Sequence, residues 1–223
     1  MTALLHLDSS SSPHSVSREL GALFARTWRE HHTGPYAYRD LVQDPVPLVE
    51  PAFVDLGERV ERNGFLPPAK VAALIETAAE QAAWDRTRPL IDQVTAADLL
   101  LLDVPMYNYS IPAALKAWID RITFPGAFID PDSGERILRD TRVVVLAARG
   151  GGYGPSDSRA GFDFQIPYLR AYFRNLGIAE SNLTVVAVDY TRAGDIPGMA
   201  VFQDRTRRLQ SLARERVMQL AAG

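Results

Sequence analysis

Cysteine is absent from this 223-residue sequence. Disulfides, thiolate nucleophiles and cysteine-ligated metals are therefore excluded. Histidine is also scarce: the sequence has four, and all of them lie within the first 32 residues. A serine hydrolase that needs a general-base histidine late in the chain is therefore disfavoured. The sequence also lacks an H-E-x-x-H or similar spacing, so no metal site is predicted.

A basic excess and a long apolar run are missing as well. Lys and Arg number 24 against 27 Asp and Glu, which leaves a formal net charge of −3 and no sign of a nucleic-acid footprint. No apolar run approaches the length that spans a membrane, and the first residues lack the basic start and apolar core of a signal peptide. We therefore expect a cytoplasmic protein with no nucleic-acid or membrane partner. The length fits one domain over residues 1–223.

Short apolar runs alternate with segments of helical periodicity along the whole sequence. Strands are predicted at 3–7, 36–41, 99–104, 142–147 and 183–188. Helices are predicted from about 16, from 67 to about 84 with a kink or restart at Pro89 and a continuation to 95, at 112–123 and 167–176, and from about 199 to 221. The prolines at 45, 47 and 51 indicate a surface loop. The run at 99–104 is continuously apolar, which indicates a strand buried on both faces of a parallel sheet.

Five strands with intervening helices predict an α/β fold, because parallel neighbours need crossover helices. The expected architecture is a doubly wound five-stranded parallel sheet in the order 2-1-3-4-5, the flavodoxin-like arrangement. In this order the loops after the first, third and fourth strands lie side by side. They would share the edge of the sheet where open α/β folds bind ligands.

The first of these loops is rich in serine, from Ser9 to Ser12 and again at Ser15 and Ser17. It contains neither a G-x-G-x-x-G fingerprint nor a P-loop. Ser15 is the expected N-cap of the next helix, whose free N–H groups and positive dipole end attract an anion. The loop therefore suits a single phosphate monoester. A plain polar turn with a serine cap is the alternative.

The other two loops offer different chemistry. Met106–Tyr109 supplies an amide and two phenols but no obvious acid, base or nucleophile, which suits a loop wrapped around a flat ring. The alternative is a set of core aromatics with a helix cap. Arg149–Gly152 lets the backbone approach a ligand closely and adds a positive charge, or else forms a flexible turn with an exposed arginine. Three complementary loops at one edge favour a ligand site.

Four blocks of sequence carry a resemblance to a known family. They are Ser9-Ser10 with Ser15-Val16-Ser17-Arg18-Glu19-Leu20, Pro105-Met106-Tyr107-Asn108-Tyr109 with Leu115-Lys116 and Asp120, Arg149-Gly150-Gly151, and 163–170 with Leu176-Gly177-Ile178. On these blocks the chain resembles the FMN-dependent NADH-azoreductases of the flavodoxin-like quinone reductase superfamily, over nearly its full length.

The resemblance implies bound FMN, with NADH or NADPH as the electron donor. It places Ser10, Ser15, Val16 and Ser17 at the phosphate and ribityl end, Met106, Tyr107, Asn108 and Tyr109 along the isoalloxazine, and Ala148, Arg149, Gly150 and Gly151 at its pyrimidine edge. Two positions depart from the family pattern, which often has serine at 148 and commonly phenylalanine at 109. A side-chain hydrogen bond is therefore missing at the first, and a hydroxyl is added at the second.

The resemblance also implies a homodimer with two FMN sites at the subunit interface. In the implied ping-pong mechanism, the donor delivers a hydride to flavin N5 and leaves, and a quinone, azo or nitroaromatic acceptor then takes two electrons. No side chain is given a catalytic role, because hydride chemistry belongs to the cofactor. Phe124, Phe128, Phe162 and Phe164 are candidate walls of the acceptor pocket, with ordinary core or interface packing as the alternative.

Two other functions stay open on the sequence. The same scaffold is compatible with one dedicated reduction in a biosynthetic pathway. A flavodoxin-like electron-transfer or binding module without turnover is the second alternative. Flavodoxins are usually shorter and more acidic, so the near-neutral charge and the additional region between residues 49 and 84 favour an enzyme.

Overall fold

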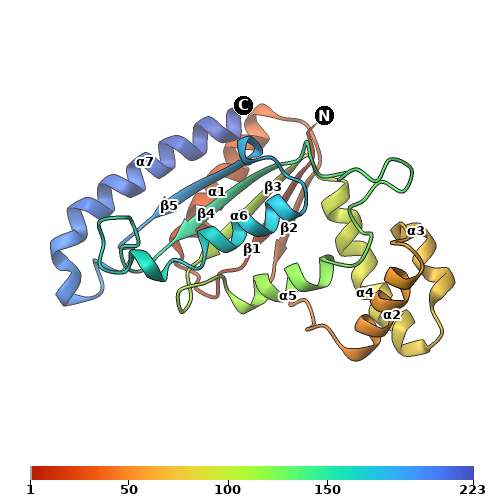
Figure 1. Cartoon of the computed structure of the whole chain (residues 1–223). Coiled ribbons are helices and arrows are strands. Elements are labelled where there is room, and N and C mark those ends of the chain that lie inside the picture. The colour runs from red at the N-terminus through yellow and green to blue at the C-terminus, as the bar shows by residue number, and fades with distance from the viewer. Residues whose placement is uncertain (1) are drawn as a thin grey trace.

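The sheet has five parallel strands in the order β2-β1-β3-β4-β5 in a computed structural model that describes residues 2–223. The strands are β1 (Leu4–Asp8), β2 (Tyr36–Asp40), β3 (Leu99–Pro105), β4 (Arg142–Ala148) and β5 (Leu183–Val188). Helices cover both faces of this sheet (Figure 1). The predicted α/β class, the doubly wound parallel sheet and its strand order are confirmed.

Seven α-helices and four short 3-10 helices connect the strands in the described residues. The α-helices are α1 (Val16–His31), α2 (Pro51–Arg62), α3 (Pro68–Val71), α4 (Ala78–Thr95), α5 (Ala113–Ile122), α6 (Ile166–Asn175) and α7 (Gln203–Ala222). The 3-10 helices are η1 (Ala72–Leu74), η2 (Ala160–Phe162), η3 (Glu180–Asn182) and η4 (Pro197–Phe202). None of these helices is both long and apolar enough to cross a lipid bilayer.

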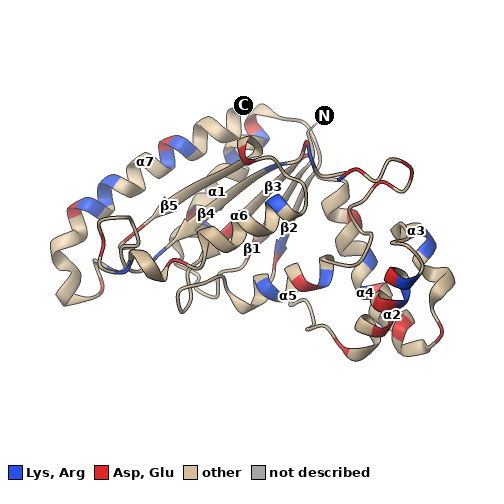
Figure 2. Cartoon of the chain, in the orientation of Figure 1, with Lys and Arg blue, Asp and Glu red and all other residues tan. Residues whose placement is uncertain are grey.

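Two hydrophobic cores lie on opposite faces of the sheet, because successive side chains of a strand point to opposite faces. Leu100 and Leu102 of β3 belong to the larger core, under α4, α5 and α6. Leu99 and Leu101 belong to the smaller core, under α1 and α7. This double burial explains why β3 is apolar at consecutive positions. Figure 2 shows that charged residues are concentrated on the helices and loops, with few on the strands.

The structure corrects the predicted helices in the region before β3. Pro51 lies in the first turn of α2, so this proline begins a helix where a surface loop was expected. The predicted helix from residue 67 is broken, because α3 and η1 end at Leu74 and α4 begins only at Ala78. That start is marked by a capping box between Thr77 and Glu80. The helix then continues through Pro89 to Thr95. Likewise, α7 begins at residue 203, after η4.

Glu80 stabilises this region through several charge-assisted contacts. Its carboxylate accepts hydrogen bonds from both Arg59 Nη atoms at 3.0 Å and from the Glu76 N–H at 2.7 Å. These bonds lower the pKa of Glu80 to about 2. Because the folded pKa lies below the usual value of 4.5, the stabilisation is complete above about pH 4.5 and is lost as the pH falls towards 2.

We expect Glu80→Gln to lower the free energy of unfolding at pH 7 by about 2–3 kcal/mol, the size expected when a buried group loses charged hydrogen bonds. Urea denaturation measures the change. Glu58→Gln is the matched control, since it removes an exposed pair with Arg62 whose contribution is about 0.5 kcal/mol or less. Equal effects of the two substitutions would contradict the role given to Glu80.

Candidate functional site

The loops after β1, β3 and β4 meet at the carboxyl edge of the sheet. Hydrogen bonds join them directly: the Ser11 N–H donates to Tyr107 Oη at 3.0 Å, and the Met106 N–H donates to the Ala148 carbonyl at 2.8 Å. The structure therefore brings together the three segments that the sequence singled out. Such an edge is the usual ligand site of an open α/β sheet.

The serine loop leads into an open helix N-terminus. Ser15 is the N-cap of α1, as predicted, but its side chain makes no capping bond and its Oγ lies 2.9 Å from Ser17 Oγ. Glu19 makes the first backbone bond of the helix, to the Ser15 carbonyl at 3.0 Å. The N–H groups of residues 16–18 therefore have no acceptor within the helix. Together with the helix dipole, they form a cradle suited to an anion.

A partly buried ion pair between Asp8 and Arg18 holds the serine loop in place. Asp8, at the end of β1, accepts a hydrogen bond from the Ser10 N–H at 2.9 Å and forms an ion pair with Arg18, whose Nε lies 2.5 Å from Asp8 Oδ2. Arg18 also donates to the Ser10 carbonyl at 2.8 Å and pairs with Asp40 at 2.9 Å. The sequence analysis missed this support. A charged residue closing an apolar strand, followed ten positions later by an arginine in the first turn of a helix, was the available signal.

His6 and Asp103 form a second buried pair beside this loop. Their Nε2 and Oδ2 atoms are 2.8 Å apart, and His6 Nδ1 lies 3.0 Å from Tyr36 Oη. Burial raises the pKa of Asp103 to about 6, against an opposing effect of His6. Ser9 Oγ donates to the Asp103 backbone carbonyl at 2.7 Å and not to the imidazole. The three residues therefore lack the contact of a Ser-His-Asp triad, and the pair supports the loop.

The loop after β3 is a tight, strained turn. Tyr107 and Ser110 exchange backbone hydrogen bonds of 3.0 and 3.1 Å, while Asn108 and Tyr109 between them have φ values of 47° and 73°. Left-handed backbone is uncommon outside glycine and costs about 1–3 kcal/mol per residue. A bond of 3.0 Å from the Phe164 N–H to the Tyr109 carbonyl holds the turn. Strain that the surroundings maintain in this way is typical of functional sites.

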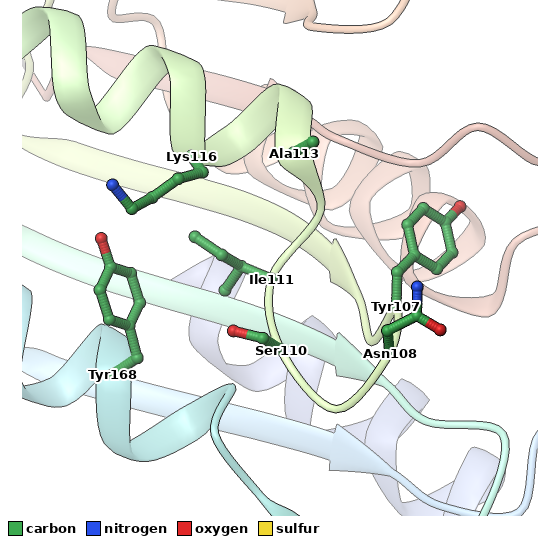
Figure 3. Close-up of a pocket in the computed structure, with 7 residues that line it drawn as sticks. All are labelled: Tyr107, Asn108, Ser110, Ile111, Ala113, Lys116 and Tyr168. Carbon is green, nitrogen blue, oxygen red and sulfur yellow. The ribbon is translucent and has the colours of Figure 1, made fainter.

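A cavity of about 450 Å³ lies beside this turn. Its lining residues come from the turn, from the start of α5 and from α6: Tyr107, Asn108, Ser110, Ile111, Ala113, Lys116 and Tyr168 (Figure 3). In Figure 3 the Lys116 amine and the Tyr168 hydroxyl approach each other on one side of the cavity. Lys116 also pairs with Asp120. The cavity beside the aromatic loop is therefore lined mainly by neutral groups.

The Arg149 side chain holds the glycine-rich loop in place. Its side chain is buried, and it pairs with Asp189 and, at 2.8 Å, with Asp163. The guanidinium therefore anchors the loop to β5 and to the segment before α6, and Arg149 is not an exposed arginine in a flexible turn. A Cβ on Gly152 would lie 2.1 Å from Tyr190 Oη, so glycine is required there. The loop presents mainly its backbone to the edge of the sheet.

The four phenylalanines separate into two groups. Phe124 and Phe128 have exposed fractions of only 4% and 3%, and Phe124 packs against Phe53 of α2 and Trp84 of α4. Both side chains therefore show the core packing that was the alternative, and Phe124 is enclosed by the unpredicted α2, while their part in an acceptor pocket stays a prediction. Phe162 and Phe164 are exposed, and the Phe162 ring centroid lies 5.3 Å from that of Tyr109.

Comparison with known proteins gives consistent results. Residues 2–212 match the protein family described as flavodoxin-like fold. The chain is 42% identical over 201 residues to an FMN-dependent NADH:quinone oxidoreductase of Nocardia farcinica, covering 90% of this chain and 88% of that protein. It is 35% identical over 207 residues to a protein of the same name from Parafrankia sp., with coverages of 92% and 91%.

Solved structures show the same fold. An azoreductase from Bacillus anthracis aligns with a TM-score of 0.81 at 20% identity, over 100% of this chain and 99% of the other. An FMN-dependent NADH-azoreductase from the same species, in complex with FMN, aligns with a TM-score of 0.76 at 21% identity over 99% and 100%. The family match and the curated relatives extend this likeness beyond the fold. The chain therefore belongs to the flavodoxin-like family of FMN-dependent NADH:quinone oxidoreductases.

Proposed function

We propose that this chain is an FMN-dependent NADH:quinone oxidoreductase that also reduces azo compounds. One observation carries the proposal: the open N-terminus of α1 lies next to the strained turn from Tyr107 to Ser110, in a chain 42% identical to a protein of that name. An anion cradle beside an aromatic loop matches a ligand with a phosphate at one end and a flat ring at the other.

The residues at the edge fit FMN in each of its parts. The phosphate and the ribityl chain suit the hydroxyls and N–H groups of Ser10, Ser15, Val16 and Ser17, where no lysine is needed. The isoalloxazine suits Met106 to Tyr109, and its pyrimidine edge suits the backbone from Ala148 to Gly151. The Arg149 guanidinium uses Nε and Nη1 for its two carboxylate partners, which hold the backbone of this loop in place.

When bound, FMN supplies a ring nitrogen that takes a hydride from NADH or NADPH and passes two electrons to the acceptor, so that donor and acceptor react in turn by a ping-pong scheme. The chain's own residues would bind the cofactor and orient it. Asp8 and Arg18 hold the serine loop in its open form, and the Phe164 N–H holds the aromatic turn. A quinone takes up the hydride and one further proton, which water would supply, so the loop needs no acid or base of its own.

We also propose that two copies of the chain, each a single domain over residues 1–223, form a homodimer around two FMN sites. The support is a group of exposed aromatic side chains at the rim of the site, Tyr107, Tyr109, Phe162 and Phe164. Apolar groups concentrated in this way are typical of protein contacts. Because NADH is a metabolite of the cell interior, we place the enzyme in the cytoplasm. Light scattering of the flavin-loaded protein measures the assembly.

An absorption spectrum tests the proposed activity. We expect the purified protein to be yellow, and anaerobic NADH to bleach the flavin band in a one-to-one titration. Steady-state NADH oxidation with menadione then distinguishes an enzyme from an electron-transfer module. Rates with a panel of acceptors show whether the enzyme serves only one reduction. A colourless protein that neither binds FMN nor is stabilised by it would overturn the proposal.

A further inference from the structure

The electron donor carries a diphosphate, and a binding site for it needs positive charge. Most cations near the three loops are already committed to carboxylates: Arg18 to Asp8 and Asp40, Lys116 to Asp120, Arg149 to Asp163 and Asp189, and Arg192 to Asp195. Arg159 differs from them. Within residues 2–223 it makes no ion pair, and its side chain is exposed. A free guanidinium at a ligand edge is a natural phosphate contact.

Arg159 borders a second cavity, of about 310 Å³, at the outer side of the glycine loop. The cavity is lined by Gly151, Gly152, Ser156, Asp157, Ser158, Arg159, Tyr190, Met199, Phe202 and Arg205. The guanidinium lies close to the loop, since a Cβ added to Gly151 would be 3.3 Å from Arg159 Nη1. The cavity therefore begins where the expected flavin site ends.

The charge balance of this cavity favours an anion. Asp157 is its one carboxylate, and that group is engaged by the Tyr190 hydroxyl, by the Gly154 N–H at 2.9 Å and by Arg205 at 3.5 Å. These contacts lower the pKa of Asp157, so it stays ionised and offsets one guanidinium only. Arg159 is left as net positive charge.

One wall of the cavity is aromatic, and the half-buried Phe202 forms its surface over the buried Tyr190. The rings of Tyr190 and Phe202 are stacked, with centroids 4.3 Å apart and planes at 19°. Tyr190 has a left-handed φ of 58°, and the Asp157 carboxylate holds its hydroxyl. An aromatic wall beside free positive charge matches a nucleotide, which has a planar base and phosphates.

We propose that this cavity binds the ADP half of the nicotinamide donor, with Arg159 at the diphosphate and Phe202, which is stacked on the buried Tyr190, offering a surface to the adenosine. The inference rests on the proposed function, because it requires the flavin to lie beside Gly151. The nicotinamide would then reach the flavin while the remainder of the donor lies over the outer side of the glycine loop. Arg159 is in this view a specificity-determining residue for the donor and has no contact with the acceptor.

The test compares Arg159→Gln with wild type, both loaded with FMN. We expect the KM for NADH to rise about tenfold, equivalent to about 1.4 kcal/mol, with kcat and the KM for menadione unchanged. Reduced nicotinamide mononucleotide lacks the adenylate half, so its kcat/KM should be the same in both proteins. Calorimetry with ADP-ribose gives a readout without turnover, and its affinity should fall by a similar factor.

Arg216→Gln is the matched control, because it removes an exposed arginine from α7 that makes no ion pair within the described chain. It should leave all five quantities unchanged: kcat, the KM values for NADH and menadione, kcat/KM with reduced nicotinamide mononucleotide, and the affinity for ADP-ribose. If the wild-type enzyme binds FMN and oxidises NADH, but Arg159→Gln alters neither the KM for NADH nor ADP-ribose binding, this inference fails and the proposed function stands. An equal loss with both nicotinamide donors would also overturn it. Failure of the wild-type protein to bind FMN would overturn both.

Discussion

Ser15→Asp is expected to weaken FMN binding at least about 100-fold while leaving the protein folded. Ser15 is the N-cap of α1, and aspartate is as favourable as serine at that position, so the helix retains its start. The new carboxylate would occupy the cradle that we assign to the phosphate. Two like charges about 4 Å apart near a protein surface repel by about 4 kcal/mol, more than enough for this loss.

Two comparisons isolate the charge. Ser15→Asn is a neutral N-cap of the same shape, and it should keep FMN affinity within about tenfold of wild type. Riboflavin lacks the phosphate, so its weaker binding should be the same in wild type and in Ser15→Asp. Fluorescence titration of the apoprotein measures all of these affinities. Retention of tight FMN binding by Ser15→Asp would place the phosphate elsewhere.

The sheet and the place of the site were predictable because they depend on local pattern and on a topological rule. A run such as Leu99 to Leu102 identifies a central strand by itself, and the strand order then fixes which loops meet. Helix α2 was missed because proline can either begin a helix or interrupt one, and the sequence near Pro51 does not separate these cases.

The groups that support the loops were harder to predict from the sequence, because each contacts a partner that is distant in sequence. Ser9 contacts the carbonyl of a residue 94 positions away, and the charge of Arg149 is taken up by carboxylates 14 and 40 positions away. Phe124 and Phe162 look alike in sequence, yet one is enclosed by α2 and the other is open. Only the packing of separate elements distinguishes such residues.

Gly21 of α1 shows how tightly one of these supports is packed. A Cβ on Gly21 would lie 2.2 Å from both carboxylate oxygens of Asp103, a distance no real contact allows. Asp103 is fully buried on a central strand and bonded to His6, so the carboxylate has no room to retreat. An alanine here would have to displace one member of the buried pair or shift α1, whose N-terminus we assign to the FMN phosphate.

We therefore expect Gly21→Ala to lower the free energy of unfolding by about 3–5 kcal/mol, the combined effect of over-packing a core and leaving a buried carboxylate without its hydrogen bond. This destabilisation is opposite to the effect of helix propensity alone, since alanine in place of glycine stabilises a helix by about 1 kcal/mol. Gly57 of α2 is the matched control, since it is also helical and buried, and a Cβ there would be 3.5 Å from its nearest neighbour, Pro125. Gly57→Ala should therefore stabilise the protein in the same urea denaturation experiment. If Gly21→Ala destabilises the protein and Gly57→Ala stabilises it, the contact with Asp103 is what prevents a side chain at position 21. If both substitutions stabilise the protein, the His6–Asp103 pair is free to move.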